Sequence, residues 1–326
     1  MSGVAAVILA AGKSTRMKSD LPKVLHDICG RPMLAWVLDA CEEAGVERSL
    51  IVVGYGKEQV RAAFADRAGC AFVEQAEQRG TGHAAQCCRA ALAGHEGPVL
   101  VIAADMPLVR GATLRGLLDE SARTGDAITL ATTILEDPSG YGRIVRNEAG
   151  ALAGIVEHRD CTRQQLDIRE VNISYYCFGN GRSLFEALDQ VGNDNAKGEY
   201  YVTDAVRILI EGGQGGGAIP AVPPAEALGI NSRADLAQIS RVMQDRIQGA
   251  WMEAGVTIVD PSSTWINHGA EIGPETIIYP FSYIEGGARI GTDCRVGPGA
   301  CLWSDDQLGA GRCVGPSAGL AGVPGK

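Results

Sequence analysis

A loop suited to binding phosphate is the first feature of this sequence that could support chemistry. The apolar segment 4–9 runs directly into residues 10–17, which read AAGKSTRM. Small residues let backbone N–H groups approach an anion, and Lys13 and Arg16 add positive charge. The loop matches neither the Walker pattern nor the dinucleotide fingerprint. It therefore predicts a phosphate site without identifying the ligand.

An acidic side chain follows another apolar run. Residues 99–103 read VLVIA, and Asp105 comes two positions later. A carboxylate at the carboxyl end of a buried parallel strand lies where α/β sheets bind ligands. Asp105 could instead cap a helix starting near Gly111, but Pro107 and Leu108 intervene. We therefore expect Asp105 to belong to a ligand site.

The elements that would position these residues alternate along the first two thirds of the chain. Apolar runs with few charges predict buried parallel strands at residues 4–10, 50–53, 70–73 and 99–103. Apolar spacing typical of helices occurs between them at residues 33–44, 58–65, 81–92 and 113–123. Repeated βαβ units require right-handed crossovers. The pattern predicts an α/β, Rossmann-like sheet with helices on both faces.

A second group of elements follows this alternation. Strand-like stretches occupy residues 127–135, 142–146, 152–157 and 171–178, and helical patterns cover residues 183–191 and 200–210. We expect them to form an antiparallel extension over one end of the sheet. The glycine-rich stretch 212–217 predicts a flexible loop. A linking helix is expected over residues 232–254.

The character of the sequence changes after Gly255. Aliphatic–glycine pairs recur with a six-residue period, at residues 272–273, 290–291, 296–297 and 314–315. This period is typical of a β-solenoid whose aliphatic side chains point inward. The alternative is a disordered Gly/Pro-rich tail, which the regular spacing up to about Leu302 argues against. We expect about four coils, with disorder over residues 309–326, and domains at residues 1–230, 231–254 and 255–326.

Composition excludes several classes of protein. The 326 residues are 46% hydrophobic and 21% charged, with a formal net charge of −10. General nucleic-acid binding is excluded because a phosphate backbone requires a basic face. The ten cysteines include no C-x-x-C pair, so zinc-site spacing is absent, and free thiols in a reducing cytosol are expected. We see no signal peptide and no apolar run long enough to span a membrane.

The segment after the glycine loop identifies a family. Residues 9–26 continue through Pro22 and Lys23, and resemble the signature of the sugar-1-phosphate nucleotidyltransferases. Further matching blocks occur in register at residues 75–84, 140–144, 155–157, 195–204 and 229–233. Over about the first 300 residues, their order resembles that of the bacterial N-acetylglucosamine-1-phosphate uridyltransferases. The resemblance implies a short left-handed parallel β-helix after the nucleotidyltransferase sheet.

The resemblance also implies roles for individual residues. The nucleotide would be held by Leu9, Ala10, Ala11, Gly12, Lys13, Gln75, Gln78, Gly80 and Thr81. A glutamine amide offers a donor and an acceptor, which suits the imide edge of a pyrimidine. The sugar would be held by Gly142, Glu157 and Asn172, although Glu157 and Asn172 could also be a surface acid and a polar strand residue. Lys13 would be an accessory contact.

The implied reaction converts UTP and N-acetylglucosamine 1-phosphate into UDP-N-acetylglucosamine and pyrophosphate. Asp105 and Asn231 would bind Mg²⁺ through oxygen, as that ion prefers. Lys23 would hold the attacking sugar phosphate, and Arg16 the leaving phosphates. No general base is expected because a sugar phosphate is already anionic, so we interpret His83 as structural.

The sequence departs from the family at two places. The family has Tyr-Gly before the metal-binding Asp, where this chain has Ala103-Ala104. It has Asn-Thr-Gly where this chain has Asn172-Ile173-Ser174. Both changes bear on sugar selectivity more than on the reaction type. The stretch 104–107 is also similar to the molybdenum-cofactor nucleotidyltransferases, which lack a solenoid.

Two alternatives stay open. One is a nucleotidyltransferase for another sugar phosphate, such as glucose 1-phosphate with UTP or dTTP. The other is a non-catalytic, nucleotide-binding regulatory subunit, because fold does not fix function. We expect a cytoplasmic protein without nucleic-acid or membrane partners, assembled as a trimer through its solenoid. We expect no acetyl transfer, since the family's acetyltransferase residues lie further along the solenoid than residue 326.

Overall fold

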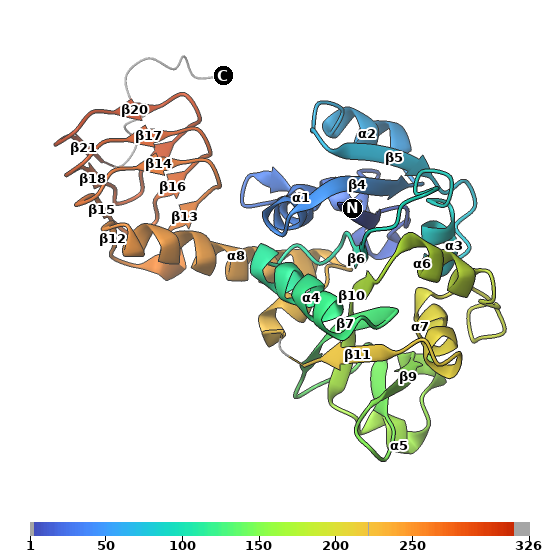
Figure 1. The fold of residues 1–326 in the computed structure, drawn as a ribbon. Helices are drawn as coiled ribbons and strands as arrows, with labels where there is room; N and C mark the ends of the chain where they lie inside the picture. Colours follow the sequence, from blue (N-terminus) through green and yellow to red (C-terminus); the bar gives the residue numbers. More distant parts are fainter. Residues whose placement is uncertain (1–2, 221, 316–326) are drawn as a thin grey trace. The chain divides into compact units, whose positions relative to one another are not determined.

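A computed structural model describes residues 3–220 and 222–315 and divides the chain into two compact units (Figure 1). The first unit runs to His26 and resumes over Met33–Ser232. The second contains the short segment Asp27–Pro32 together with the chain from Arg233 onward. The predicted linking helix therefore packs as part of the second unit.

A nine-stranded sheet forms the centre of the first unit. Its main path has the order β11-β7-β10-β6-β1-β4-β5, with β8 pairing to β10 and β9. The strands are β1 (Val4–Leu9), β4 (Val46–Val53), β5 (Cys70–Glu74), β6 (Val99–Ala103), β7 (Ile128–Ile134), β8 (Arg143–Arg146), β9 (Leu152–Val156), β10 (Glu170–Phe178) and β11 (Gly216–Ile219). Strands β6, β1, β4 and β5 are parallel, as predicted.

Helices cover both faces of this sheet because the strand side chains alternate between them. Ala6 and Ile8 of β1 join the core cluster beneath α1, α2 and α4, whereas Ala5 and Val7 join the cluster beneath α3, α6 and α7. These helices are α1 (Met33–Glu43), α2 (Lys57–Ala63), α3 (Thr81–Gln86), α4 (Gly111–Thr124), α6 (Gly181–Leu188) and α7 (Val202–Glu211). Shorter helices are η1 (Thr15–Met17), η2 (Lys23–Leu25), η3 (His158–Asp160), α5 (Arg163–Leu166) and η4 (Pro224–Ala227). The predicted fold class is confirmed for this unit.

Three local expectations are corrected. Strand β10 lies inside the sheet, antiparallel to β6 and β7, and is not part of a peripheral extension. Nearly all of its side chains are buried, which suits a central strand. Gly216 and Gly217 are not loop residues, because they pair with Ile128 and Thr129 at the start of β11. The predicted helix over 81–92 ends at Gln86 and continues as turns.

The second unit contains the predicted β-helix. Its short parallel strands form three sheets, β12-β15-β18-β21, β13-β16-β19 and β14-β17-β20. They are β12 (Thr257–Ile258), β13 (Trp265–Ile266), β14 (Glu271–Ile272), β15 (Ile277–Ile278), β16 (Tyr283–Ile284), β17 (Arg289–Ile290), β18 (Arg295–Val296), β19 (Cys301–Leu302), β20 (Gln307–Leu308) and β21 (Cys313–Val314), with η5 (Pro261–Ser263) between β12 and β13. The second residue of each strand is buried, so the aliphatic side chains fill the interior as predicted.

The β-helix continues further towards the C-terminus than expected. Its strands begin at Thr257, within the expected domain 255–326, and continue through Val314. The expected disorder from Gly309 is therefore wrong up to Gly315, because β21 pairs with β18 as the last strand of the sheet β12-β15-β18-β21. Residues 316–326 lie outside the described part of the chain.

Helix α8 (Arg233–Glu253) closes the first coil with buried glutamines. The Gln244 side chain donates from Nε2 to Ile266 O at 2.7 Å and accepts from Ile266 N at 2.9 Å. Gln248 donates to Thr264 O at 2.8 Å. These side-chain amides hydrogen-bond to the backbone N–H and C=O groups at the free edge of β13, as a neighbouring strand would. The hairpin of β2 (Asp27–Ile28) and β3 (Arg31–Pro32) belongs to the same unit.

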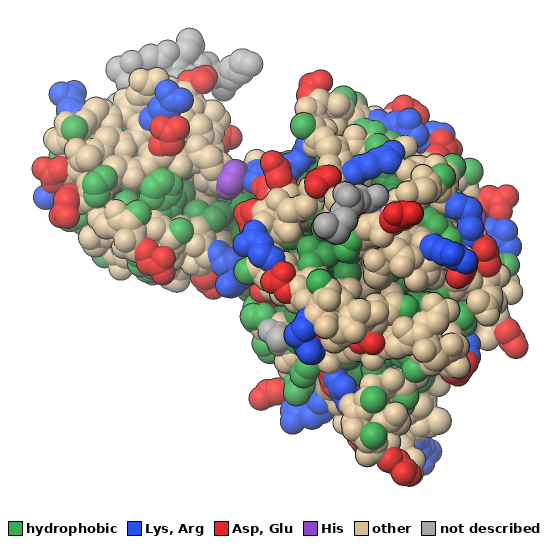
Figure 2. All heavy atoms as spheres, viewed as in Figure 1, with side chains coloured by type: hydrophobic (Ala, Val, Ile, Leu, Met, Phe, Trp, Pro, Cys, Tyr) green, Lys and Arg blue, Asp and Glu red, His purple; other side chains and the backbone are tan. Residues whose placement is uncertain are grey.

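The surface carries charges of both signs. Lys and Arg side chains intermingle with Asp and Glu on the face drawn in Figure 2. Within residues 3–220 and 222–315, every helix is too short or too polar to cross a membrane.

Candidate active site

A cavity of about 530 Å³ lies at the carboxyl ends of β1 and β6 in the first unit. Most of the sequence-predicted site residues line it. These are Leu9, Ala11, Gly12, Lys13, Gln75, Gln78, Gly80, Thr81, Asp105, Gly142, Glu157 and Asn172. Ala10, Arg16, Lys23 and Asn231 do not line it: Ala10 is buried beneath the loop, and the other three form a polar cluster with Asp105.

The glycine loop is fixed by backbone contacts to the neighbouring strand. Ala10 N donates to Val52 O at 3.0 Å, and Ala11 O accepts from Tyr55 N at 3.2 Å. Ala11 O also accepts from Gln78 Nε2 at 2.8 Å, which draws the second predicted nucleotide segment against the loop. The Lys13 ammonium lies 4.9 Å from the centroid of the Tyr55 ring. These contacts join the loop to β4 and to the segment around Gln78.

Four polar side chains that are far apart in the sequence meet beside the cavity. Lys23 Nζ lies 2.6 Å from Asp105 Oδ2 and 3.4 Å from Asn231 Oδ1. Arg16 Nη2 donates to the same Asn231 oxygen at 2.8 Å. Ile230 N donates to Asp105 O at 3.0 Å, which holds Asn231 next to the end of β6. The structure thus brings the predicted catalytic and metal-binding residues together.

The two oxygen atoms in this cluster are suitable ligands for Mg²⁺. Asp105 Oδ2 and Asn231 Oδ1 both contact the Lys23 ammonium, so their lone pairs converge on one cation. Mg²⁺ prefers oxygen and commonly takes only one or two protein carboxylates, with water and substrate phosphates completing the octahedron. The described residues contain no group of three or more His, Cys, Asp or Glu side chains that could hold a metal unaided. The residues therefore fit Mg²⁺ bound together with a phosphorylated substrate.

Gly80 belongs to a wall made of two chain segments. Tyr200 N donates to Arg79 O at 2.9 Å, and Gly82 N donates to Tyr200 O at 2.7 Å. Gly80 has φ +109°, and a Cβ on it would lie 2.4 Å from Tyr200 O. Any other residue at Gly80 would have to separate the two segments. The sequence blocks 75–84 and 195–204 therefore lie side by side and form one wall of the cavity.

The opposite end of the cavity holds the predicted sugar-binding residues. Thr203 Oγ1 donates to Glu157 Oε1 at 3.1 Å, and burial raises the pKa of the Glu157 carboxyl. Asn172 N donates to Gly142 O at 2.9 Å across β10 and β8. Asn172 Nδ2 donates to Tyr176 Oη at 2.7 Å. Glu157 and Asn172 therefore both belong to the cavity wall, where each is also hydrogen-bonded within the protein.

Ser174 departs from the family pattern within this wall. Its φ is +58°, in the left-handed region, at a bulge that interrupts the pairing of β10 with β7. Its amide donates to Asn172 Oδ1 at 3.1 Å. The family that the sequence resembles has glycine here, which adopts this conformation without strain. The bulge aims Asn172 and Ser174 into the cavity.

Sequence reasoning left several lining residues without a role, among them five with polar side chains. Tyr176, Lys197, Glu199, Tyr201 and Thr203 all line the cavity. Apart from Tyr176, they lie in block 195–204, which served only to identify the family, although its mixture of charged and aromatic residues was a usable signal. Tyr176 lies in an apolar strand and gave no such signal. The histidine at position 83 does not line the cavity.

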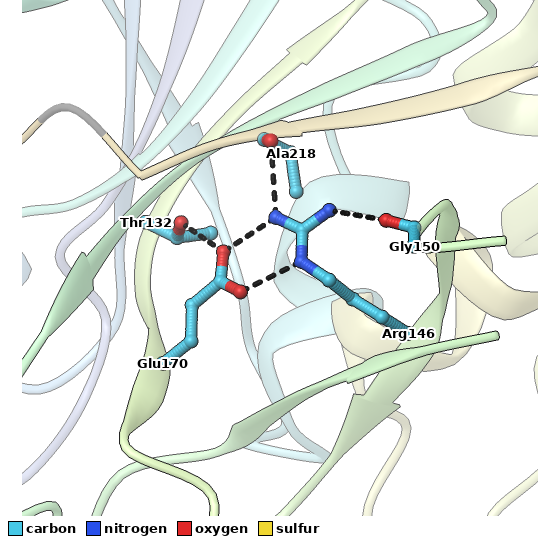
Figure 3. Close-up of polar contacts among 5 residues, drawn as sticks. All are labelled: Thr132, Arg146, Gly150, Glu170 and Ala218. Atoms are coloured by element: carbon cyan, nitrogen blue, oxygen red, sulfur yellow. Dashed lines mark hydrogen bonds and ion pairs between the residues drawn. The ribbon is translucent and has the colours of Figure 1, made fainter. Parts of the chain in front are cut away.

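A partly buried ion pair joins strands of the sheet (Figure 3). Arg146 donates to Glu170 through Nε at 2.7 Å and Nη2 at 2.6 Å. Thr132 Oγ1 donates to Glu170 Oε1 at 2.7 Å, and Arg146 also contacts the carbonyls of Gly150 and Ala218. Burial raises the pKa of Glu170, but the hydrogen bonds from Arg146 and Thr132 outweigh it and leave the pKa below its usual value. The network joins β7, β8, β10 and β11.

Two protein-family models match parts of the chain. Residues 6–203 match the family described as the MobA-like NTP transferase domain. Residues 269–302 match the bacterial transferase hexapeptide family, described as six repeats.

Individual relatives are similar along most of the chain. The bifunctional protein GlmU of Geobacter metallireducens is 46% identical over 296 residues, 91% of this chain and 62% of that protein. GlmU of Geobacillus thermodenitrificans is 46% identical over 89% of this chain and 63% of its own length. The chain thus spans less than two thirds of these relatives. A solved structure of a UDP-glucose pyrophosphorylase complexed with UDP-glucose matches with a TM-score of 0.60 and 19% identity, over 74% of this chain and 98% of that one, and shows a shared fold.

Proposed function

This chain belongs to the MobA-like NTP transferase domain family, and on that premise we propose that it transfers uridylyl from UTP to N-acetylglucosamine 1-phosphate. The products are UDP-N-acetylglucosamine and pyrophosphate. The observation that carries the proposal is the meeting of Lys23, Arg16, Asp105 and Asn231 beside a cavity lined by the predicted nucleotide and sugar residues. A protein that only bound nucleotides would not require this cluster.

The reaction needs positioning and charge neutralisation more than proton transfer. A phosphate oxygen of the sugar phosphate attacks the α-phosphorus of UTP, a new P–O bond forms, and the bond to the β-phosphate breaks with its electrons leaving on pyrophosphate. Both the nucleophile and the leaving group are anionic, so the barrier is dominated by their repulsion. In the proposal Lys23 holds the attacking phosphate and Arg16 holds the leaving phosphates.

Asp105 and Asn231 would bind Mg²⁺, which supplies positive charge to the phosphates when bound. The Lys23 ammonium contacts both of these oxygens. The proposal therefore gives Lys23 two partners, the metal-binding carboxylate and the substrate phosphate. At the other end of the cavity, Gly142, Glu157 and Asn172 would contact the sugar and its N-acetyl group.

One assay tests the proposal against its alternatives. Pyrophosphate release is measured with Mg²⁺ for every pairing of UTP, dTTP, CTP and GTP with glucose 1-phosphate, N-acetylglucosamine 1-phosphate and glucosamine 1-phosphate. We expect the highest kcat/KM for UTP with N-acetylglucosamine 1-phosphate. A higher value for glucose 1-phosphate would reassign the sugar. Absence of turnover with all pairs would rule out the proposed enzyme and favour the alternative, a nucleotide-binding regulatory subunit.

We also propose that the β-helix makes the protein a trimer in the cytoplasm. A solenoid of a few coils gains stability when a neighbour covers it. All ten cysteines are unpaired, which fits a reducing compartment. Light scattering that gave the mass of a monomer at micromolar concentration would overturn the trimer.

A further inference from the structure

The side-chain amide of Gln75 uses both of its N–H groups inside the protein. Gln75 is 4% exposed and lines the cavity at the predicted nucleotide end. Its Nε2 lies 3.0 Å from Gly80 O and 3.1 Å from His83 Nδ1. An amide nitrogen carries only two hydrogens. No described residue donates to Oε1, so this oxygen is available to accept a hydrogen bond from a ligand.

The partners of Gln75 fix the direction of its amide. Gly80 O is a carbonyl oxygen and can only accept, so the nitrogen of Gln75 must face it. The same nitrogen then donates its second hydrogen to His83 Nδ1, which must be unprotonated. This hydrogen bond requires the His83 tautomer that carries its proton on Nε2. A ring protonated on Nδ1 would place an N–H donor against the N–H donor of Gln75, and the hydrogen bond that orients the Gln75 amide would be lost.

We propose that His83 is a positioning residue for nucleotide selection, acting through Gln75. With both hydrogens engaged, Gln75 presents an acceptor alone, which matches the N3–H donor of uracil. Cytosine has an unprotonated N3 and would meet Gln75 Oε1 with a second acceptor. His83 thereby favours UTP over CTP without contacting either. The proposal rests on the proposed function, since it explains the base specificity of that reaction.

The position of His83 agrees with an indirect role. It lines a separate hollow of about 220 Å³ on the other side of the wall, together with Arg79, Asp189 and Tyr200. Asp189 is already engaged by Gln86 at 2.8 Å and by an arginine. His83 cannot exchange a proton with a substrate in the cavity from there. Its substitution should change nucleotide binding and leave the chemical step intact.

The test compares two substitutions at this position. In His83→Asn, Oδ1 replaces Nδ1 as an acceptor, whereas His83→Leu removes the acceptor. We expect His83→Leu to raise KM for UTP by ~10-fold, the effect of losing a hydrogen bond at the upper end of the usual range. Its kcat should stay within ~2-fold and its preference for UTP over CTP should fall. His83→Asn should retain most of the wild-type KM and preference.

A matched control is His95→Leu. His95 Nε2 lies 3.4 Å from Pro98 O, outside the cavity lining, and its loss should leave both constants unchanged. Thermal unfolding of each variant identifies any global loss of structure. An unchanged KM and UTP preference in His83→Leu would overturn the proposal. So would a loss of kcat at constant KM, which would make His83 a general base.

Two further measurements do not depend on turnover. Nitrogen-15 NMR of the wild-type imidazoles should show His83 protonated on Nε2 and unprotonated on Nδ1, and the opposite tautomer would overturn the proposal. Calorimetry with UTP and CTP measures binding directly. The Kd for UTP should be ~10-fold higher in His83→Leu than in His83→Asn. If the wild type binds UTP selectively but turns over no pair of substrates, the proposed enzyme fails while the His83 inference stands.

Discussion

Asp105 is the residue on which the proposed chemistry depends most. It accepts from Lys23 at 2.6 Å and supplies the only carboxylate of the proposed metal pair. Asp105→Ala should lower kcat at least ~10²-fold, the scale of losing one electrostatic stabiliser, and Arg16→Ala should do the same. Pyrophosphate release at saturating substrates measures both. Asp119→Ala removes an exposed carboxylate of α4 and serves as control; an equal loss there would show that net charge alone is responsible.

Ser174 offers a test of strain at the sugar end. A side chain in the left-handed region costs about 1 kcal/mol, and Ser174 has φ +58°. Ser174→Gly should therefore raise the free energy of unfolding by up to ~1 kcal/mol, whereas Ser174→Ala keeps the strain and should gain nothing. Urea unfolding measures both variants. Equal stability of the two would mean that the backbone at the bulge is not strained.

Among the elements, the sheet and the β-helix could be predicted because their signals are local. Apolar runs of strand length and a six-residue aliphatic period depend only on neighbouring residues. The central place of β10 could not be predicted, since chain order does not give spatial order in a mixed sheet. The cap provided by Gln244 was also missed, because a buried glutamine in a helix resembles any surface residue until its partner, Ile266, is known.

The site shows the same division between local and long-range information. The loop around Gly12 and the position of Asp105 followed from strand–loop patterns. The contacts of Arg16 and Lys23 with Asn231 join residues more than 200 positions apart, and only the family resemblance suggested them. The direction of the Gln75 amide depends on Gly80 and on a histidine, which no sequence pattern specifies.

The Arg146–Glu170 pair makes a prediction about the strands it joins. The folded-state pKa of Glu170 is lowered, so its contribution to stability is complete above the unfolded-state value of about 4.3 and is lost as pH falls through the folded-state value. Glu170→Gln should cost about 2 kcal/mol at pH 7, because hydrogen bonds to charged groups are lost from a partly buried site. It should also flatten the fall in stability between pH 5 and pH 3.

Urea unfolding at several pH values measures this effect. Glu120→Gln is the matched control, since Glu120 pairs with Arg123 on the exposed face of α4. The control should change stability much less, because exposed ion pairs contribute little. Equal effects of the two substitutions would show that the Arg146–Glu170 network does not stabilise the sheet.

For the whole molecule, the division into units places one segment unexpectedly. The chain enters the hairpin Asp27–Pro32 after His26 and returns at Met33, where Met33 N donates to His26 O at 2.9 Å. Within the second unit, His268 N donates to Cys29 O at 2.9 Å, and Ile28 is fully buried. The hairpin begins four residues after Lys23. Inside the second unit, this hairpin is thus bonded to chain that follows Ser232.

This dependence predicts the behaviour of a chain ending at Ser232. Removing the second unit's helix and coils would expose Ile28 and Cys29, and exposing one aliphatic side chain such as Ile28 costs ~1.5–3 kcal/mol. We expect the shortened chain to unfold at lower temperature and to associate through the uncovered hairpin. Because His26 and Met33 already meet, replacing residues 27–32 with Gly-Gly in the shortened chain should restore much of the lost stability. Thermal unfolding and light scattering compare the two; if both shortened chains behave alike, the hairpin does not rely on the rest of the second unit for its burial.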